Sequence, residues 1–138
     1  MTRRVTRDRI VHAFDKANQP VLDLEPGEVV TLETLDAFNG RVTSGDEDPD
    51  GIDTTKANPA TGPLRVVGAE PGDVLAVDIL DMRLQDQGAT IVLTGSTALR
   101  DRFQTSQIKI IPVRDGHAIL ANDVRVPVHP MIGVIGVA

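Results

Sequence analysis

The sequence contains no cysteine, tryptophan or tyrosine, and aromatic residues make up only 2% of its 138 positions. Without cysteine, the chain can form no disulfide and carries no thiol nucleophile or zinc ribbon. It has few rings for base stacking, no broad basic stripe and a formal charge of -6. Nucleic-acid binding is therefore not expected, and a reducing compartment, the cytoplasm, fits the lack of cysteine.

Long apolar runs are absent as well. No run approaches the ~20 residues that span a membrane, and residues 1–16 lack the uninterrupted apolar segment of a signal peptide. The sequence also has no Gly-x-Ser-x-Gly elbow, Walker loop or dinucleotide fingerprint. We therefore expect no membrane partner and none of the common nucleophile or nucleotide sites.

What the sequence does contain is turn chemistry and short alternating apolar segments. Residues 25–28 and 70–73 both read Glu-Pro-Gly-acid, a pattern that favours a type II turn. The Asp115-Gly116 pair between apolar runs predicts a hairpin. Strands are expected in several short segments: 29–38, 74–82, 89–95 and the apolar terminus 131–138. The pattern predicts an all-β antiparallel sandwich or barrel with at most one short helix, near residues 96–104.

Acidic residues crowd one segment, at Asp46, Glu47, Asp48, Asp50 and Asp53. Like charges at this density favour a solvated loop. A cation site is the alternative, although the spacing is not that of an EF-hand.

Asp36 is the first candidate catalytic residue. Alternation over residues 29–38 places it on the more apolar face of the expected strand, where a carboxylate can serve as a base or a metal ligand. An Asp before a turn that contains glycine also commonly accepts backbone hydrogen bonds. Both roles stay open. Three histidines accompany it, His12, His117 and His129, and no two are spaced as a metal pair.

Four separated motifs, in order, resemble the acetamidase/formamidase family between His12 and Ala138. They are Glu33-Thr34-Leu35-Asp36, Asn58-Pro59-Ala60-Thr61-Gly62-Pro63, Gly68-Ala69-Glu70-Pro71-Gly72-Asp73 and Pro130-Met131-Ile132-Gly133. The resemblance implies a jelly-roll β-sandwich over residues 12–138, preceded by an extension at residues 1–11. It also implies hydrolysis of short linear amides to carboxylate and ammonia.

The same resemblance suggests roles for individual residues. Asp36 and His12 are the expected catalytic residues, and Asp36 is the expected ligand of a divalent metal, zinc or calcium. Asn39, Gly40, Asn58 and Thr61 are expected to bind the substrate, although Asn58 and Thr61 also suit a turn.

Members of that family continue beyond the Pro-Met-Ile-Gly segment into a half that is rich in His, Asp and Glu. We therefore expect a hydrolase component that is completed by a second chain, or a homo-oligomer whose partner covers the apolar terminus. The alternative is a stand-alone β-sandwich that has lost amidase activity and binds or rearranges a small molecule.

Overall fold

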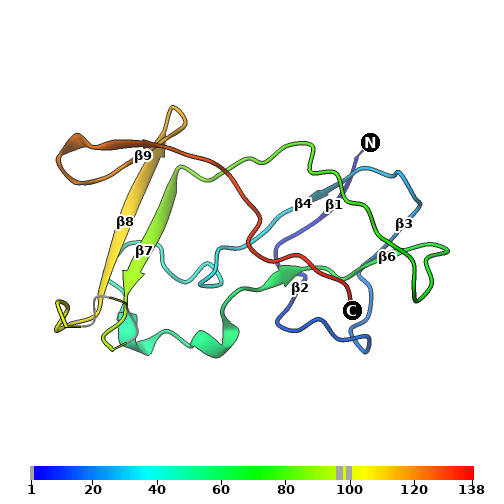
Figure 1. Cartoon of the computed structure of the whole chain (residues 1–138), viewed down its shortest axis with the longest axis horizontal. Coiled ribbons are helices and arrows are strands. Elements are labelled where there is room, and N and C mark those ends of the chain that lie inside the picture. Colours follow the sequence, from blue (N-terminus) through cyan, green and yellow to red (C-terminus); the bar gives the residue numbers. More distant parts are fainter. Residues whose placement is uncertain (1, 96–97, 99–100) are drawn as a thin grey trace. The chain divides into compact units, whose positions relative to one another are not determined.

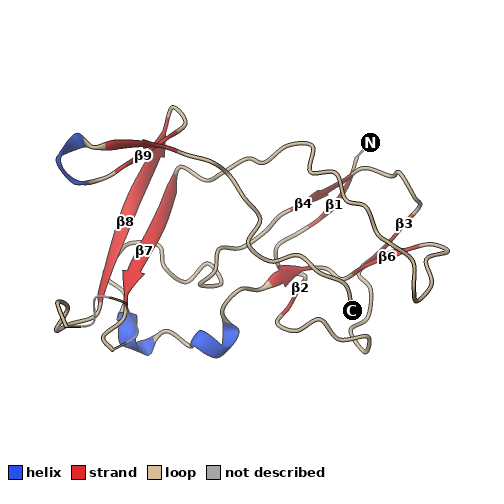
Figure 2. Cartoon of the chain, in the orientation of Figure 1, coloured by secondary structure: helices blue, strands red, loops and turns tan. Residues whose placement is uncertain are grey.

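The computed structural model describes residues 2–95, 98 and 101–138, and its regular secondary structure there consists mainly of short strands, which long loops connect (Figures 1 and 2). The all-β expectation is confirmed, since the described helical segments are three 3₁₀ turns: η1 (Pro49–Gly51), η2 (Thr54–Lys56) and η3 (Ala121–Asp123). No helix in the described ranges is long and apolar enough to cross a membrane. Four of the nine residues of the helix expected near residues 96–104 lie outside the described residues, and the described ones, 98 and 101–104, are not helical.

The chain divides into two compact units. The first unit comprises residues 1–40, 54–79 and 132–138, and the second comprises residues 41–53 and 80–131. The second unit holds an antiparallel four-stranded sheet in the order β10-β9-β8-β7. Its strands are β7 (Gln87–Val92), β8 (Gln107–Arg114), β9 (His117–Ile119) and β10 (Arg125–Pro127).

The turn between β8 and β9 is the predicted hairpin. Asp115 and Gly116 have φ values of 49° and 70°, the left-handed conformation that a two-residue type I′ turn requires at both central positions. The hairpin prediction is confirmed, and β7 confirms most of the strand expected at residues 89–95.

The first unit contains three two-stranded pairs. Strand β2 (Ile10–Val11) pairs antiparallel with β5 (Ala60–Thr61). The other two pairs are parallel, β1 (Arg3–Val5) with β4 (Val30–Leu32) and β3 (Leu22–Leu24) with β6 (Leu64–Val66). The sequence pattern indicated antiparallel strands and gave no sign of these two parallel pairs. The first eleven residues supply two of these strands.

Both Glu-Pro-Gly-acid segments form the same turn. At residues 25–28 and 70–73 the fourth residue's N–H donates to the first residue's carbonyl at 3.0 Å. The glycines have φ values of 81° and 104°, which a side chain would strain. In return, each fourth-position carboxylate accepts the N–H of the first residue, at 3.1 and 2.9 Å. The two segments therefore use one turn chemistry twice.

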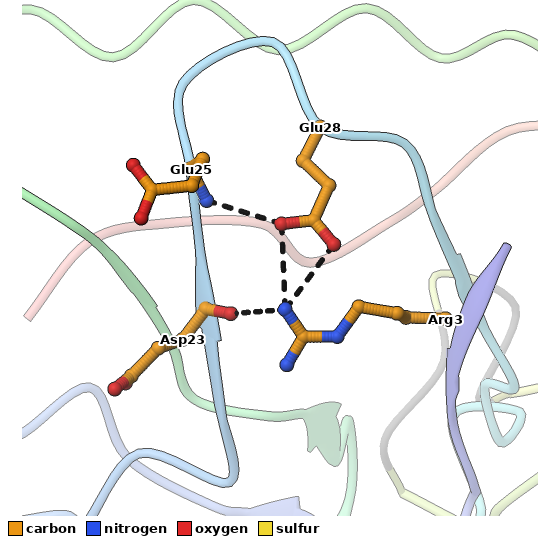
Figure 3. Close-up of polar contacts among 4 residues, drawn as sticks. All are labelled: Arg3, Asp23, Glu25 and Glu28. Atoms are coloured by element: carbon orange, nitrogen blue, oxygen red, sulfur yellow. Dashed lines mark hydrogen bonds and ion pairs between the residues drawn. The ribbon is translucent and has the colours of Figure 1, made fainter.

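The first of these turns is tied to β1 by Arg3 (Figure 3). One guanidinium nitrogen of Arg3 donates to the carbonyl of Asp23 at 2.6 Å and to both carboxylate oxygens of Glu28, at 3.2 and 3.3 Å. The N–H of Glu25, followed by Arg3, lowers the pKa of Glu28. The turn and the N-terminal strand are thus held as one piece.

Three predicted strands are wrong or too long. Strand β4 ends at Leu32, so residues 33–38 are loop, and residues 74–82 and 131–138 form no strand. Few side chains of the described residues are buried: Val5, Leu24, Val42 and Pro59. An alternation of apolar and polar residues predicts that one face of a segment can be buried. A strand also needs a partner strand to pair with, and no described segment pairs with these residues.

Candidate functional site

Three segments of the first unit come together around Asp36. Pairing of β2 with β5 sets Ile10 opposite Thr61 and Val11 opposite Ala60. The loop of residues 33–40 joins the β5 side through the N–H of Asn58, which donates to the carbonyl of Ala37 at 2.9 Å. All six predicted site residues therefore lie in one unit.

Asp36 caps its own loop. Its Oδ1 accepts the N–H of Phe38 at 2.8 Å and the N–H of Gly40 at 3.0 Å. Its carbonyl accepts the N–H of Asn39 at 3.0 Å. The side chain is exposed, and no hydrogen bond to its Oδ2 is found among the described residues. The capping role is thus visible, and a catalytic role for Oδ2 stays a prediction.

The predicted substrate-binding positions in these loops hold left-handed backbone. Asn39, Gly40 and Asn58 have φ values of 61°, 67° and 54°, a conformation that asparagine and glycine adopt more readily than other residues. A Cβ on Gly40 would also stand 3.1 Å from Cδ2 of Leu35. Each of these residue types is explained by loop geometry, and a role in binding substrate stays a prediction.

Thr61 contacts the protein itself. Its hydroxyl donates to the carbonyl of Glu33 at 2.7 Å, and its side chain is half-buried. The hydroxyl expected to bind substrate therefore fastens the start of the Asp36 loop to β5.

The side chain of Glu33 anchors the same end of this loop, a role that the sequence pattern did not indicate. Its carboxylate pairs with the guanidinium of Arg4 and accepts the N–H of Arg7 at 3.3 Å. The hydrogen bond from Arg4, and then that from Arg7, lowers the pKa of Glu33. The sequence holds no local signal for these contacts, because an acid on the polar side of a strand can equally well be solvated.

The histidines are spread over both units. His12 directly follows β2 and is exposed, and continuing the β2–β5 register by one residue sets it opposite Pro59. His117 lies in β9 of the second unit, with Nδ1 2.7 Å from the carbonyl oxygen of Asp115. His129, also in the second unit, is exposed. Of the three, only His12 belongs to the unit that holds Asp36.

In the acidic segment, carboxylate side chains accept hydrogen bonds from the backbone of the same segment. The carboxylate of Glu47 accepts the N–H groups of Thr43, Ser44 and Gly45 at 2.7, 3.0 and 2.8 Å. These bonds, led by that of Thr43, lower the pKa of Glu47 to about 2. Asp48 caps η1 by accepting the N–H of Asp50 at 3.1 Å. The segment is a hydrogen-bonded loop in the second unit, as the solvated-loop interpretation expects.

A divalent metal would need several of the described His, Asp and Glu side chains as ligands. Within the described part of the chain, no three His, Asp or Glu side chains lie close enough together to hold a metal ion. Asp36 offers one oxygen, and a zinc site takes about four ligands. The described residues do not make a metal site by themselves, so no catalytic step is assigned to a metal.

A shallow hollow of about 600 Å³ in the described part of the second unit is lined by Asp86, Gln87 and residues 112–115. None of the predicted site residues lies in it. The Asp36 loops are by contrast exposed, which leaves any reacting group there in contact with water.

The fold of this β-rich chain is similar to that of two solved structures. It superposes on a predicted acetamidase/formamidase from the thermophile Thermoanaerobacter tengcongensis with a TM-score of 0.93 and 35% identity, covering all of this chain and 46% of that one. An acetamidase from Bacillus halodurans gives a TM-score of 0.89 and 34% identity, over 95% of this chain and 44% of that one. The chain therefore has the fold of these acetamidase structures.

The sequence defines the family. The chain belongs to the acetamidase/formamidase family, whose family model matches residues 6–138. The formamidase of Methylophilus methylotrophus is 30% identical over 128 residues, which cover 82% of this chain and 30% of that protein. The chain therefore spans less than half the length of the relatives named here.

Proposed function

We propose that this chain is one component of an amidase that hydrolyses the C–N bond of short linear amides and is completed by a second polypeptide. The observation that carries the amidase proposal is the family match over residues 6–138, together with a TM-score of 0.93 at 35% identity to one relative. The formamidase and acetamidase names of the relatives suggest formamide and acetamide as first substrates.

Amide hydrolysis needs an activated water, donors for the tetrahedral oxyanion and a proton for the departing amine. Asp36 Oδ2 is proposed as the base that takes a proton from water, with Oδ1 held in place by Phe38 and Gly40. His12 is proposed as the second catalytic residue. The backbone around Asn39, Gly40 and Asn58 is proposed to bind the substrate.

The second polypeptide would supply what the described residues lack. Electrostatic stabilisation of a transition state is strongest where water is excluded, whereas Asp36 and His12 are both exposed here. Any divalent cation would take at most one donor from the Asp36 loop and the rest from that polypeptide. The jelly-roll topology and the cytoplasmic location stay predictions.

The test is ammonia release from formamide and acetamide. It is measured for the purified chain, then after addition of a polypeptide with the rest of the family fold, with and without divalent metal. Activity is expected only in the mixture. Activity of the chain alone contradicts completion by a second polypeptide, and an inactive mixture that nevertheless forms a stable complex contradicts the amidase function and favours the small-molecule-binding alternative.

A further inference from the structure

The loop that carries Asp36 ends in an Asn-Gly pair, Asn39-Gly40, the single such pair in the sequence. The side chain of Asn39 is half-buried, and within the described part of the chain no hydrogen bond holds its amide group. Gly40 has no Cβ to obstruct its own backbone nitrogen. Such a pair lets the backbone nitrogen of the glycine reach the side-chain carbonyl carbon, Cγ, of the asparagine.

The same pair is held by the cap of Asp36. The N–H of Gly40 donates to Oδ1 of Asp36 at 3.0 Å, and the N–H of Asn39 donates to the carbonyl of Asp36 at 3.0 Å. Attack on Cγ requires the Gly40 nitrogen to lose its proton and to leave Oδ1. The carboxylate beside it opposes negative charge on that nitrogen. The cap therefore keeps the reactive nitrogen protonated and away from Cγ.

We propose that Asn39-Gly40 is a self-modification site whose reaction Asp36 restrains. The backbone nitrogen of Gly40 forms a bond to Cγ of Asn39, the Cγ–Nδ2 bond breaks, and Nδ2 leaves as ammonia with the proton that the Gly40 nitrogen gave up. Water then adds to either carbonyl of the cyclic imide and opens it to aspartate or isoaspartate. One water enters and one ammonia leaves, so no oxidant, reductant or cofactor takes part.

The products change the candidate site in two ways. Aspartate puts a second carboxylate in the loop of Asp36, and isoaspartate routes the main chain through Cβ, which lengthens it by one atom before Gly40. Either product should weaken binding of substrate by this backbone, a consequence that rests on the proposed function. The modification itself does not depend on that function, since it is measured by the mass of the chain.

The reaction is followed in the purified chain by tryptic digestion and mass spectrometry, after incubation in mildly alkaline buffer made with heavy-oxygen water. Conversion at Asn39 changes the amide to an acid and incorporates the heavy oxygen, and fragment ions locate the change. Asn18 is an internal reference, because trypsin leaves it in the same peptide, residues 17–41. Gln19 follows it, and its Nδ2 is held by the carbonyl of Ala13 at 2.8 Å.

Asn58 is a second reference with the same backbone conformation. Its φ of 54° is close to the 61° of Asn39, but Pro59 follows it and has no N–H to lose. Asn58 should therefore not form the imide, which separates the effect of the following residue from that of the left-handed backbone.

Asn39 should convert at least about tenfold faster in guanidinium chloride than in the folded chain, because the folded loop reacts only during local opening. Asp36→Asn should speed conversion in the folded chain about fivefold, the effect of removing one unit charge at this distance in water, with little change in melting temperature. Asp15→Asn is the matched control, since Oδ1 of Asp15 likewise accepts a backbone N–H, that of Ala17 at 2.8 Å. It should leave the rate at Asn39 unchanged.

Equal rates at Asn39 in the folded parent and in Asp36→Asn overturn the proposal, as does equal conversion of Asn39 and Asn18 in the unfolded chain. It also fails if Asp36→Asn lowers the melting temperature and speeds Asn39 and Asn18 alike, because general loss of the fold then explains the rate.

The result can be separated from the amidase proposal. This reaction releases at most one ammonia per chain, so turnover of added formamide or acetamide exceeds it. Conversion at Asn39 as expected, in a mixture that hydrolyses neither amide, overturns the proposed function alone. Amide turnover by a chain in which Asn39 converts equally fast in the parent and in Asp36→Asn overturns the self-modification proposal alone.

Discussion

The hydroxyl of Thr61 donates a 2.7 Å hydrogen bond to the backbone carbonyl of Glu33, across 28 positions of sequence. This bond joins β5 to the loop that carries Asp36. It links two family motifs that the sequence shows only as separate stretches.

Thr61→Val should lower the melting temperature of the chain. The change removes the donor to a half-buried carbonyl, which costs about 1 kcal/mol and corresponds to roughly 2–8 °C in a domain of this size. Thr61→Ser retains the hydroxyl and should stay close to the parent in calorimetry. If Thr61→Val and Thr61→Ser melt together, the hydroxyl does not hold the loop.

Two substitutions at Asp36 separate capping from catalysis. Asp36→Asn keeps an oxygen for the N–H groups of Phe38 and Gly40, so the melting temperature should change little, whereas turnover of the completed amidase should fall ~100-fold or more. Asp36→Ala removes the cap as well and should destabilise the fold by about 1 kcal/mol. Full ammonia release by Asp36→Asn would show that the residue only caps the loop.

Local chemistry explains which parts of the fold the sequence predicts. The Glu-Pro-Gly turns and the Asp115-Gly116 hairpin depend on residues next to one another, and both are confirmed. The parallel pairing of β1 with β4 and of β3 with β6 depends on segments about 27 and 42 positions apart (Arg3↔Val30, Leu22↔Leu64), and no local pattern specifies it. Residues 74–82 show the same limit, because an apolar alternation predicts burial without naming what covers it.

The site was predictable to a similar extent. Asp36 was found from its motif, and its capping bonds follow from the glycine four positions later. The contacts of Glu33 with Arg4 and Arg7 join the loop to the N-terminal segment, so they appear only once the chain is folded.

Glu47 should make stability depend on pH at the acidic end. Its pKa falls from 4.5 to about 2 on folding, so the folded state holds the charged form more strongly than the unfolded chain does. The stabilisation is complete above the unfolded pKa of 4.5 and is lost as pH falls toward about 2,. Glu47→Gln should therefore melt below the parent at pH 6 and approach it near pH 2.5. A constant difference between the two proteins across that range in calorimetry would contradict this assignment.

Calcium or zinc should leave the melting temperature of the isolated chain unchanged. A ligand that binds only the folded state raises stability by mass action, and the described residues offer no group of three metal-binding side chains. The measurement is a thermal melt with and without excess metal. A rise that disappears in Asp46→Asn and Asp48→Asn would instead assign a cation to the acidic loop.

The apolar terminus approaches the N-terminal part of the first unit where Gly136 lies beside the ring of Phe14. A Cβ added at Gly136 would stand 2.7 Å from Cε2 of Phe14 and 3.0 Å from Cδ2. Gly136→Ala should therefore push the ring aside and destabilise the fold by about 1 kcal/mol, the low end for overpacking, because Phe14 is 48% exposed and has room to turn.

Gly133→Ala is the matched control, since nothing lies within 4 Å of its Cβ position. The double variant Phe14→Ala with Gly136→Ala should show no further loss relative to Phe14→Ala, because the clash has been removed. Equal melting temperatures for Gly136→Ala and Gly133→Ala would mean that the terminus does not pack on Phe14 in solution.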